Sequence, residues 1–364
     1  MNALDFYNAW LDSRVASTDI GVDGGSFKAA KKRFGAGAAW DAVKRNLRTT
    51  TKLRFKSAFK LPIFADYPIN AAEKRFGIDY VRYICEKRPV FADGLFAGDS
   101  QEEIKRILST HFLAAHFDHV PWKEIFPGPH YEEFRKAERK HMALLTKKGD
   151  CYNYNGFKTR TVGFEYGVLA NHCGLDVIPS ERLESVKGSV VIDCGAFDGD
   201  SAFYFSSLSA YRILALEPDD HNFKALHENM ELNSMESVVP LKCGVGDEKC
   251  TVSFSTGMAC AKIADEGDMK IEIERIDDLV KEHGSGRPVG IIKMDIEGYE
   301  TKALMGAAQT ICADKPILII ALYHSGRDFF EIPAYLKSLR PDYSMHIASL
   351  NPLTPIFEKY VIAY

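Results

Sequence analysis

Short, largely apolar runs dominate the second half of this chain. They lie at 190–192, 211–216, 238–241, 291–294 and 317–322. Runs of this length are typical of buried strands in a parallel sheet. Between two of them, residues 220–233 place Phe223, Leu226 and Met230 at helical spacing. The alternation of strands and helices predicts an open, doubly wound α/β sheet.

The first half of the chain has apolar residues at helical spacing instead. In 102–117, residues Ile104, Ile107, Leu108 and Phe112 would lie on one face of a helix. We therefore expect a mainly helical N-terminal domain over residues 1–150. A connector over 151–185, with a hairpin turning at its Asn-Gly pair, would join it to an α/β domain at 186–364. A chain of 364 residues is long enough for two domains.

A loop with two glycines follows the first predicted strand of the α/β domain. Gly195 and Gly199 lie four residues apart, a spacing that differs from the G-x-G-x-x-G of dinucleotide sites. Glycines at such a turn let the backbone approach a nucleotide-type ligand closely. We predict that the loop and its flanks contact the ligand through Asp193, Gly195, Ala196, Phe197, Asp198, Gly199, Asp200 and Ser201.

The next strand ends on Glu217, followed by Pro218 and lying 22 residues beyond Gly195. An acid at about this distance accepts hydrogen bonds from ribose hydroxyls, although a solvated carboxylate at a strand end is the alternative. After the third strand, residues 244–247 follow as a loop. We predict that this loop, with Gly246 and Asp247, lies beside the adenine, with a plain turn as the alternative.

Acids or a histidine recur at the ends of four strands, as Asp193, Glu217, Asp295 and His324. Ligand-binding groups of open α/β sheets gather at that edge of the sheet. Glu297 follows Asp295 by two residues. Two carboxylates so close together at this edge are more typical of a ligand-binding site than of a solvated surface.

With these motifs, the second half of the chain resembles the FkbM family of methyltransferases that use S-adenosylmethionine (SAM). The resemblance covers roughly residues 186–364 and rests on 191–199, 216–218, 276–279, 293–300 and the strand that ends at His324. It implies a Rossmann-like class I methyltransferase fold, in which one antiparallel strand lies at the edge of a mostly parallel sheet. It also implies O-methylation, often of a sugar in a polysaccharide or natural product. The helical N-terminal domain would then serve as a cap, an acceptor-binding unit or a dimerisation surface.

The catalytic residues predicted for this reaction are His324, Asp295 and Glu297. His324 is our first choice for the general base because an unperturbed imidazole titrates near neutrality. Asp295 and Glu297 are the rivals, and Asp295 is also predicted to contact SAM. The alternatives are a histidine that caps a strand and a carboxylate at a helix N-terminus. Paired carboxylates and a histidine could also hold Mg²⁺, but we do not favour a metal.

Composition and charge disfavour several other classes of function. A net charge of −4 gives no reason to expect a nucleic-acid partner, and no stretch approaches the length of a membrane span. No secretory signal is evident, and eight scattered cysteines without a C-x-x-C fit a reduced, cytoplasmic protein. Seven basic residues between 42 and 65 could dock an anionic partner or form a solvated face. A metal at His111, His116 and His119 is not favoured.

Several questions stay open from the sequence. The oligomeric state is open, and a homo-oligomer is one of the alternatives. The acceptor could be a protein or a small metabolite instead of a sugar. The fold could also serve as an inactive scaffold. An NAD-dependent oxidoreductase is disfavoured by the glycine spacing.

Overall fold

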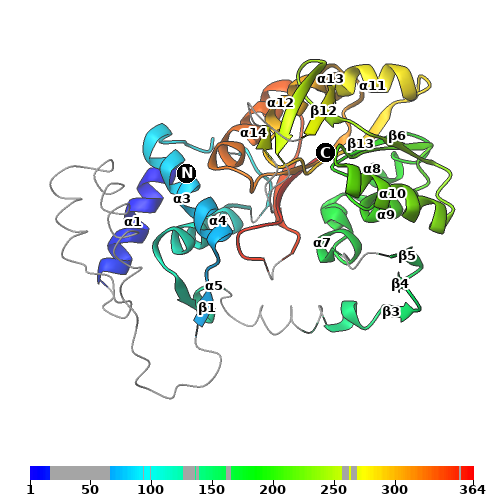
Figure 1. The fold of residues 1–364 in the computed structure, drawn as a ribbon. Helices are drawn as coiled ribbons and strands as arrows, with labels where there is room; N and C mark the ends of the chain where they lie inside the picture. The colour runs from blue at the N-terminus through cyan, green and yellow to red at the C-terminus, as the bar shows by residue number, and fades with distance from the viewer. Residues whose placement is uncertain are drawn as a thin grey trace.

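The structure is a computed structural model that describes most of the chain (Figure 1). The described residues are 1–16, 66–92, 94–98, 100–125, 136, 139–160, 165–255, 262–263, 269–351 and 354–364. The basic stretch between 42 and 65 lies outside them.

Helices form most of the described N-terminal region. They are α1 (Ala3–Ala16), α3 (Ala71–Lys87), α4 (Ser100–His116) and α5 (Trp122–Ile125), with the short antiparallel pair β1 (Asp66–Pro68) and β2 (His119–Pro121). A capping box starts α3, since the Asn70 side chain accepts from the Glu73 amide and Glu73 accepts from the Asn70 amide. Apolar side chains of α1, α3 and α4 pack into one core with part of the sheet domain.

A small antiparallel sheet and short helices lead into the sheet domain. Its strands are β3 (Leu145–Lys148), β4 (Cys151–Tyr154) and β5 (Phe157–Thr159). Asn155 and Gly156 turn the chain between β4 and β5, and both have positive φ. The helical turns α7 (Tyr166–Leu169), η2 (His172–Val177) and α8 (Ser180–Glu184) follow.

The main sheet has seven strands in the order β15-β16-β14-β13-β6-β7-β8. Their bounds are β6 (Val190–Cys194), β7 (Arg212–Leu216), β8 (Val238–Leu241), β13 (Val289–Met294), β14 (Ile317–Ala321), β15 (Met345–Ser349) and β16 (Lys359–Ala363). The predicted mostly parallel α/β sheet is confirmed, but its antiparallel strand does not lie at the edge. That strand is β16, which pairs antiparallel with β14 on one side and β15 on the other. β15 therefore takes the edge position.

Helices cover both faces of this sheet. They are α9 (Asp200–Ser206), α10 (Asp220–Asn233), α11 (Ile276–His283), α12 (Glu300–Gly306), α13 (Ala308–Asp314) and α14 (Gly326–Leu339). Successive residues of β6 alternate between two cores, with Val190 and Ile192 in one and Val191 in the other. Phe205 of α9 belongs to the core of Val191. Leu304 of α12 belongs to the core of Ile192.

A second, smaller sheet lies after β8, in the order β11-β10-β12-β9. Its strands are β9 (Gly244–Val245), β10 (Cys250–Ser255), β11 (Lys262–Ile263) and β12 (Met269–Glu274). The loop predicted at 244–247 therefore begins as a two-residue strand, because Gly244 and Val245 pair in parallel with the end of β12.

Helix α3 contacts α14 of the sheet domain, as the cyan and orange ribbons of Figure 1 show. The Tyr80 hydroxyl on α3 donates to the carbonyl of Leu322, and the Asp79 carboxylate accepts from the Gly326 amide. These bonds bracket the loop that follows β14. Within the described residues, no helix has both the length and the apolar character needed to cross a membrane.

Candidate active site

The glycine loop after β6 has a conformation that only glycine fits at its first position. Gly195 has a φ of +74°, and a Cβ there would lie 2.0 Å from the carbonyl oxygen of Asp295. Gly199, with a φ of +91°, is the N-cap residue of α9. The amides of Gly195 and Ala196 both donate to the Leu216 carbonyl. The loop is thus held between the ends of β7 and β13.

Asp193, at the end of β6, is a buried acid whose contacts stabilise this loop. It is fully buried, Ser201 Oγ donates to its Oδ2 at 2.6 Å, and Lys293 Nζ lies 3.2 Å from its Oδ1. Lys293 also donates to the Gly195 carbonyl at 3.0 Å. Burial alone would lower the pKa of Lys293, but the charges of Asp193 and Asp295 raise it. Lys293 therefore remains a cation that ties β13 to the loop.

The other loop residues divide between buried and exposed. Ala196, Asp198, Asp200 and Ser201 are buried, whereas the Phe197 ring is 52% exposed. Burial, and then the neighbouring Asp198 charge, raise the pKa of the Asp200 carboxyl well above its usual value. Of this set, Phe197 is therefore the side chain that reaches solvent and can contact a ligand.

Glu217 lies at the end of β7 and faces the glycine loop. Its Oε2 accepts from the Phe197 amide at 3.0 Å and its Oε1 from the Asp219 amide at 2.9 Å. Burial raises the pKa of Glu217 to about 7, and the two amides oppose that shift. Each carboxylate oxygen has a further lone pair for a ligand hydroxyl. Pro218, which follows, is partly buried and leads into the N-cap of α10.

Gly246 and Asp247 lie against α12. A Cβ on Gly306 would lie 1.9 Å from the Gly246 carbonyl oxygen, so this loop and the helix are in close contact. Asp247 is exposed, and its Oδ1 lies 3.8 Å from Lys302 Nζ. Their predicted contact with an adenine stays a prediction.

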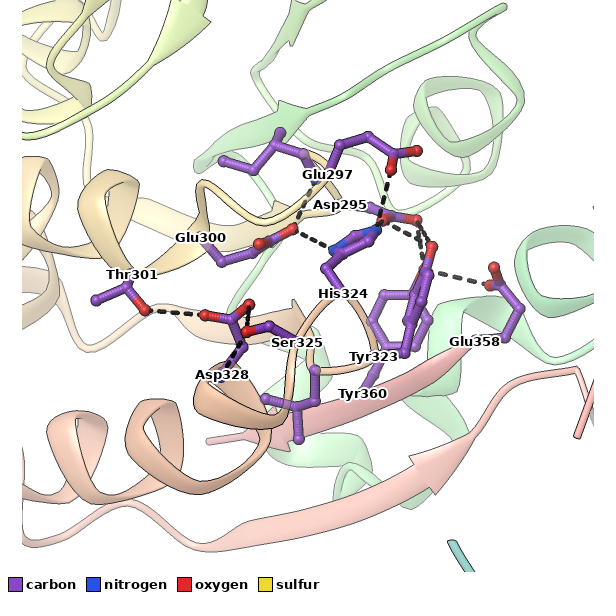
Figure 2. Close-up of polar contacts among 12 residues, drawn as sticks. Asp295, Glu297, Glu300, Thr301, Tyr323, His324, Ser325, Asp328, Glu358 and Tyr360 are labelled. Carbon is purple, nitrogen blue, oxygen red and sulfur yellow. Dashed lines mark hydrogen bonds and ion pairs between the residues drawn. The ribbon is translucent and has the colours of Figure 1, made fainter. Parts of the chain in front are cut away.

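A second cluster of polar side chains lies at the ends of β13 and β14 (Figure 2). Nδ1 of His324 lies 2.9 Å from Glu300 Oε1, and its Nε2 lies 3.4 Å from Asp295 Oδ1 and 3.7 Å from Glu297 Oε2. The His324 and Glu300 side chains are 3% and 0% exposed, whereas Glu297 is 44% exposed. Glu297 has a φ of +60° and is followed by Gly298 at +95°. This backbone turns the Glu297 side chain toward His324.

Two tyrosines hold Asp295 from the other side. Tyr360 on β16 donates to its Oδ2 at 2.6 Å, and Tyr323 donates to its Oδ1 at 2.9 Å. Tyr360 also lies 3.2 Å from Glu358, where burial raises the pKa of the carboxyl well above its usual value. Asp295 is therefore a carboxylate with fixed orientation at the lip of the cluster.

The surroundings of His324 argue against its role as general base. Burial would lower its pKa, but the charges of Glu300, Asp295 and Glu297 raise it to about 10. An imidazole with that pKa is protonated at neutral pH and cannot accept a proton. Burial also raises the pKa of Glu297.

Several residues of this site, among them Lys293, Glu300 and Tyr360, have no place in the predicted set. Lys293 could have been predicted from the sequence, because a lysine inside a buried strand needs an anionic partner. The sequence indicates Glu300 more weakly, because it is only the last acid of the segment 293–300. Nothing in the sequence indicates Tyr360, because only the antiparallel pairing of β16 brings it to Asp295.

The N-terminal histidines lie elsewhere and do not form a shared cluster. His111 is buried and stacks on Tyr80, with ring centroids 3.7 Å apart, and burial lowers its pKa to about 3. His116 contacts the Tyr7 hydroxyl at 2.9 Å. Among the described residues, the group of side chains that could hold a metal is Asp295, Glu300 and His324.

The strand order, with its single antiparallel strand, and the glycine loop after β6 define a class I methyltransferase fold. Residues 193–343 match the family model of the methyltransferase FkbM domain. This part of the chain is therefore an FkbM methyltransferase domain.

Known methyltransferases resemble this chain over part of its length. A hexuronic acid methyltransferase, AglP of Haloferax volcanii, is 27% identical over 180 residues, or 48% of this chain and 72% of that protein. Methyltransferase 1 of Beauveria bassiana is 23% identical over 176 residues, or 41% of this chain and 71% of that protein. The crystal structure of methyltransferase FkbM from Methylobacillus flagellatus KT superposes with a TM-score of 0.51 at 22% identity. That match covers 79% of this chain but only 60% of the solved chain.

Proposed function

We propose that this protein is a SAM-dependent O-methyltransferase that methylates a hydroxyl group of a sugar, in a glycan or a natural product. The observation that carries the proposal is the contact between the two halves of the site. Gly195 of the glycine loop lies directly against the Asp295 carbonyl, so a ligand on the loop would lie beside the acidic cluster. The sugar is supported by the similarity to a hexuronic acid methyltransferase.

The residues on the β6–β7 side suit SAM. The absence of a Cβ at Gly195 lets the end of β13 lie directly against the loop, and Glu217 offers two carboxylate oxygens to the ribose hydroxyls. Phe197, half exposed beside Glu217, would cover the ligand. When bound, SAM supplies a methyl group that its positive sulfur already activates. The protein therefore contributes mainly alignment of the acceptor oxygen with that methyl group.

The residues on the β13–β14 side suit a hydroxyl acceptor. Asp295 and Glu297 are partly exposed carboxylates that can accept hydrogen bonds from sugar hydroxyls. One of them would take the hydroxyl proton as the oxygen attacks. His324 is enclosed by acids and would position these carboxylates instead of acting as the base.

The test begins with calorimetric titration of the purified protein with SAM and S-adenosylhomocysteine. We expect micromolar binding that the Glu217→Ala variant loses by at least about 100-fold, since ribose hydroxyls would lose both acceptors. A folded protein that binds neither compound would favour an inactive scaffold. Binding followed by methylation of a protein or small metabolite, with no sugar accepted, would keep the SAM site and overturn the acceptor.

A further inference from the structure

The Nε2 atom of His324 is a buried polar atom for which the described part of the chain provides no aligned hydrogen bond. The side chain is 3% exposed, and the acids nearest to Nε2 lie 3.4 and 3.7 Å away. Burying a polar group without a partner costs free energy. Such exceptions in folded proteins point to a bound water, an ion or a functional role.

The position of the ring suggests an ion. Nδ1 lies 2.9 Å from Glu300 Oε1, and that oxygen is itself fixed because it accepts from the Ile296 amide at 2.9 Å. Nε2 is directed toward Asp295 and Glu297, as Figure 2 shows. A histidine that binds a metal through one nitrogen usually has its other nitrogen held by a carboxylate in this way.

The distances also suit a cation. Asp295, Glu300 and His324 have ligand atoms within 4.8 Å of one another, and Glu297 Oε2 lies 3.7 Å from the same imidazole. The separations of 3.4 and 3.7 Å from Nε2 to the two outer carboxylates are too long for direct hydrogen bonds. They are short enough for one ion to contact both groups, because metal–oxygen and metal–nitrogen distances are about 2.0–2.6 Å.

We propose that Asp295, Glu297 and Nε2 of His324 bind one divalent cation, Mg²⁺ or Mn²⁺, with Glu300 orienting the imidazole. The cation would displace the proton that Nε2 carries in the metal-free protein, because a metal binds the neutral imidazole. Two carboxylates and one imidazole match the ligands of these hard cations, and no thiolate is present that would select zinc. Asp295 and Glu297 are 18% and 44% exposed, so the open coordination positions would face a substrate.

The cation would have a role on the acceptor side of the site. A hydroxyl bound to it would lose its proton more readily, and a carboxylate oxygen of Glu297 that does not contact the cation would take that proton. The hydroxyl oxygen would then form its bond to the methyl carbon as the bond from that carbon to the sulfur of SAM breaks. This role rests on the proposed methyl transfer, whereas binding of the cation does not. The two claims can therefore fail separately.

The test is titration of the full-length protein, freed of metal with a chelator, with Mn²⁺, while electron paramagnetic resonance follows the free ion. We expect one tightly bound Mn²⁺ per chain that Mg²⁺ displaces. Glu297→Gln and Asp295→Asn should each weaken binding at least tenfold. Glu297 is nearly half exposed, so its substitution tests the site with little risk to the fold.

The matched control is Asp176→Asn. It removes the acid of an exposed histidine–carboxylate pair, in which His172 Nδ1 lies 2.9 Å from Asp176 Oδ1. This variant should bind Mn²⁺ like the unmodified protein. Absence of a tight Mn²⁺ site, or equal binding by the Glu297→Gln variant, would overturn the proposal. SAM titration in the presence of chelator tests the methyltransferase proposal independently.

Discussion

The two sides of the candidate site are built from contacts of very different range. On the β6–β7 side, Glu217 is held by backbone amides two and 20 residues away in the sequence. On the β13–β14 side, Asp295 is held by tyrosine hydroxyls 28 and 65 residues away. The first side is made by a strand, a turn and the next strand. The second needs three strands of the sheet to be in place.

Glu217 on the first side and His324 on the second also differ in how well their polar atoms are satisfied. Both oxygens of Glu217 have aligned donors, as expected of a rigid ligand-binding edge. On the other side, His324 and one oxygen of Glu300 are buried without aligned partners. Unsatisfied buried groups are costly and concentrate where a protein does chemistry. This difference supports our proposal that the methyl donor binds on the β6–β7 side and that the acceptor reacts on the β13–β14 side.

Lys293 links the two sides, and its loss should have the largest effect. In Lys293→Met, Asp193 would stay fully buried without its cation, so we expect a loss of about 3–5 kcal/mol in the free energy of unfolding. Urea denaturation measures it. Lys249→Met, which breaks an exposed pair with Glu274, is the control and should leave stability nearly unchanged. Equal stability of the two variants would show that β13 does not depend on this pair.

The fold was predictable from the sequence because its signals are local. The predicted helix 220–233 and strand 238–241 coincide with α10 and β8, and the apolar runs that end on acids are strands of one sheet. The position of β16 was not predictable, because its place between β14 and β15 depends on pairings between distant segments.

The site was predictable to a similar degree. Strand-end residues Asp295 and His324 do meet, because neighbouring parallel strands end at one edge. The protonation state of His324 was not predictable. It depends on Glu300 and Glu297 lying on opposite sides of the ring, a matter of side-chain packing.

Gly195→Ala should damage both sides at once. The new Cβ would lie 2.0 Å from the Asp295 carbonyl oxygen, so the loop and the end of β13 would have to separate. We expect a loss of at least about 3 kcal/mol in stability, from the clash and the positive φ together. Gly286→Ala is the control, because Gly286 has a similar φ of +71° and no neighbour within 4 Å. It should cost only about 1 kcal/mol. Similar losses in thermal denaturation would mean that the loop does not need this contact.

The pH dependence of SAM binding should isolate the β6–β7 side. Glu217, with a pKa raised to about 7, must be a carboxylate to accept two hydroxyls. Affinity should therefore fall about tenfold per pH unit below 7 and level off above it. Stability without ligand should change in the opposite direction. The folded state holds the proton more tightly, so stability falls as pH rises from about 4.5 to 7, by on the order of 3 kcal/mol.

Glu217→Gln separates this effect from other titrations. The substitution removes the titrating carboxyl, so SAM affinity and stability should both depend less on pH in this range. The unliganded variant should also be more stable than the unmodified protein at pH 8. Calorimetry and urea denaturation at several pH values measure the two profiles. Unchanged pH profiles in the variant would show that another group controls binding.

Tyr360→Phe should have the smallest effect and should be confined to the β13–β14 side. The variant removes one donor to Asp295 but leaves Tyr323 in place, so the carboxylate keeps a partner and loses some of its fixed orientation. We expect turnover about fivefold lower, equivalent to roughly 1 kcal/mol, with unchanged SAM affinity. Tyr343→Phe makes the same chemical change at a buried hydroxyl that donates to the Pro316 carbonyl, before the start of β14. That control should lose stability but not turnover. A matching loss of turnover in both variants would mean that Tyr360 acts through stability alone. A loss confined to Tyr360→Phe would show that this tyrosine, 65 residues away in the sequence, orients the Asp295 carboxylate for the reaction.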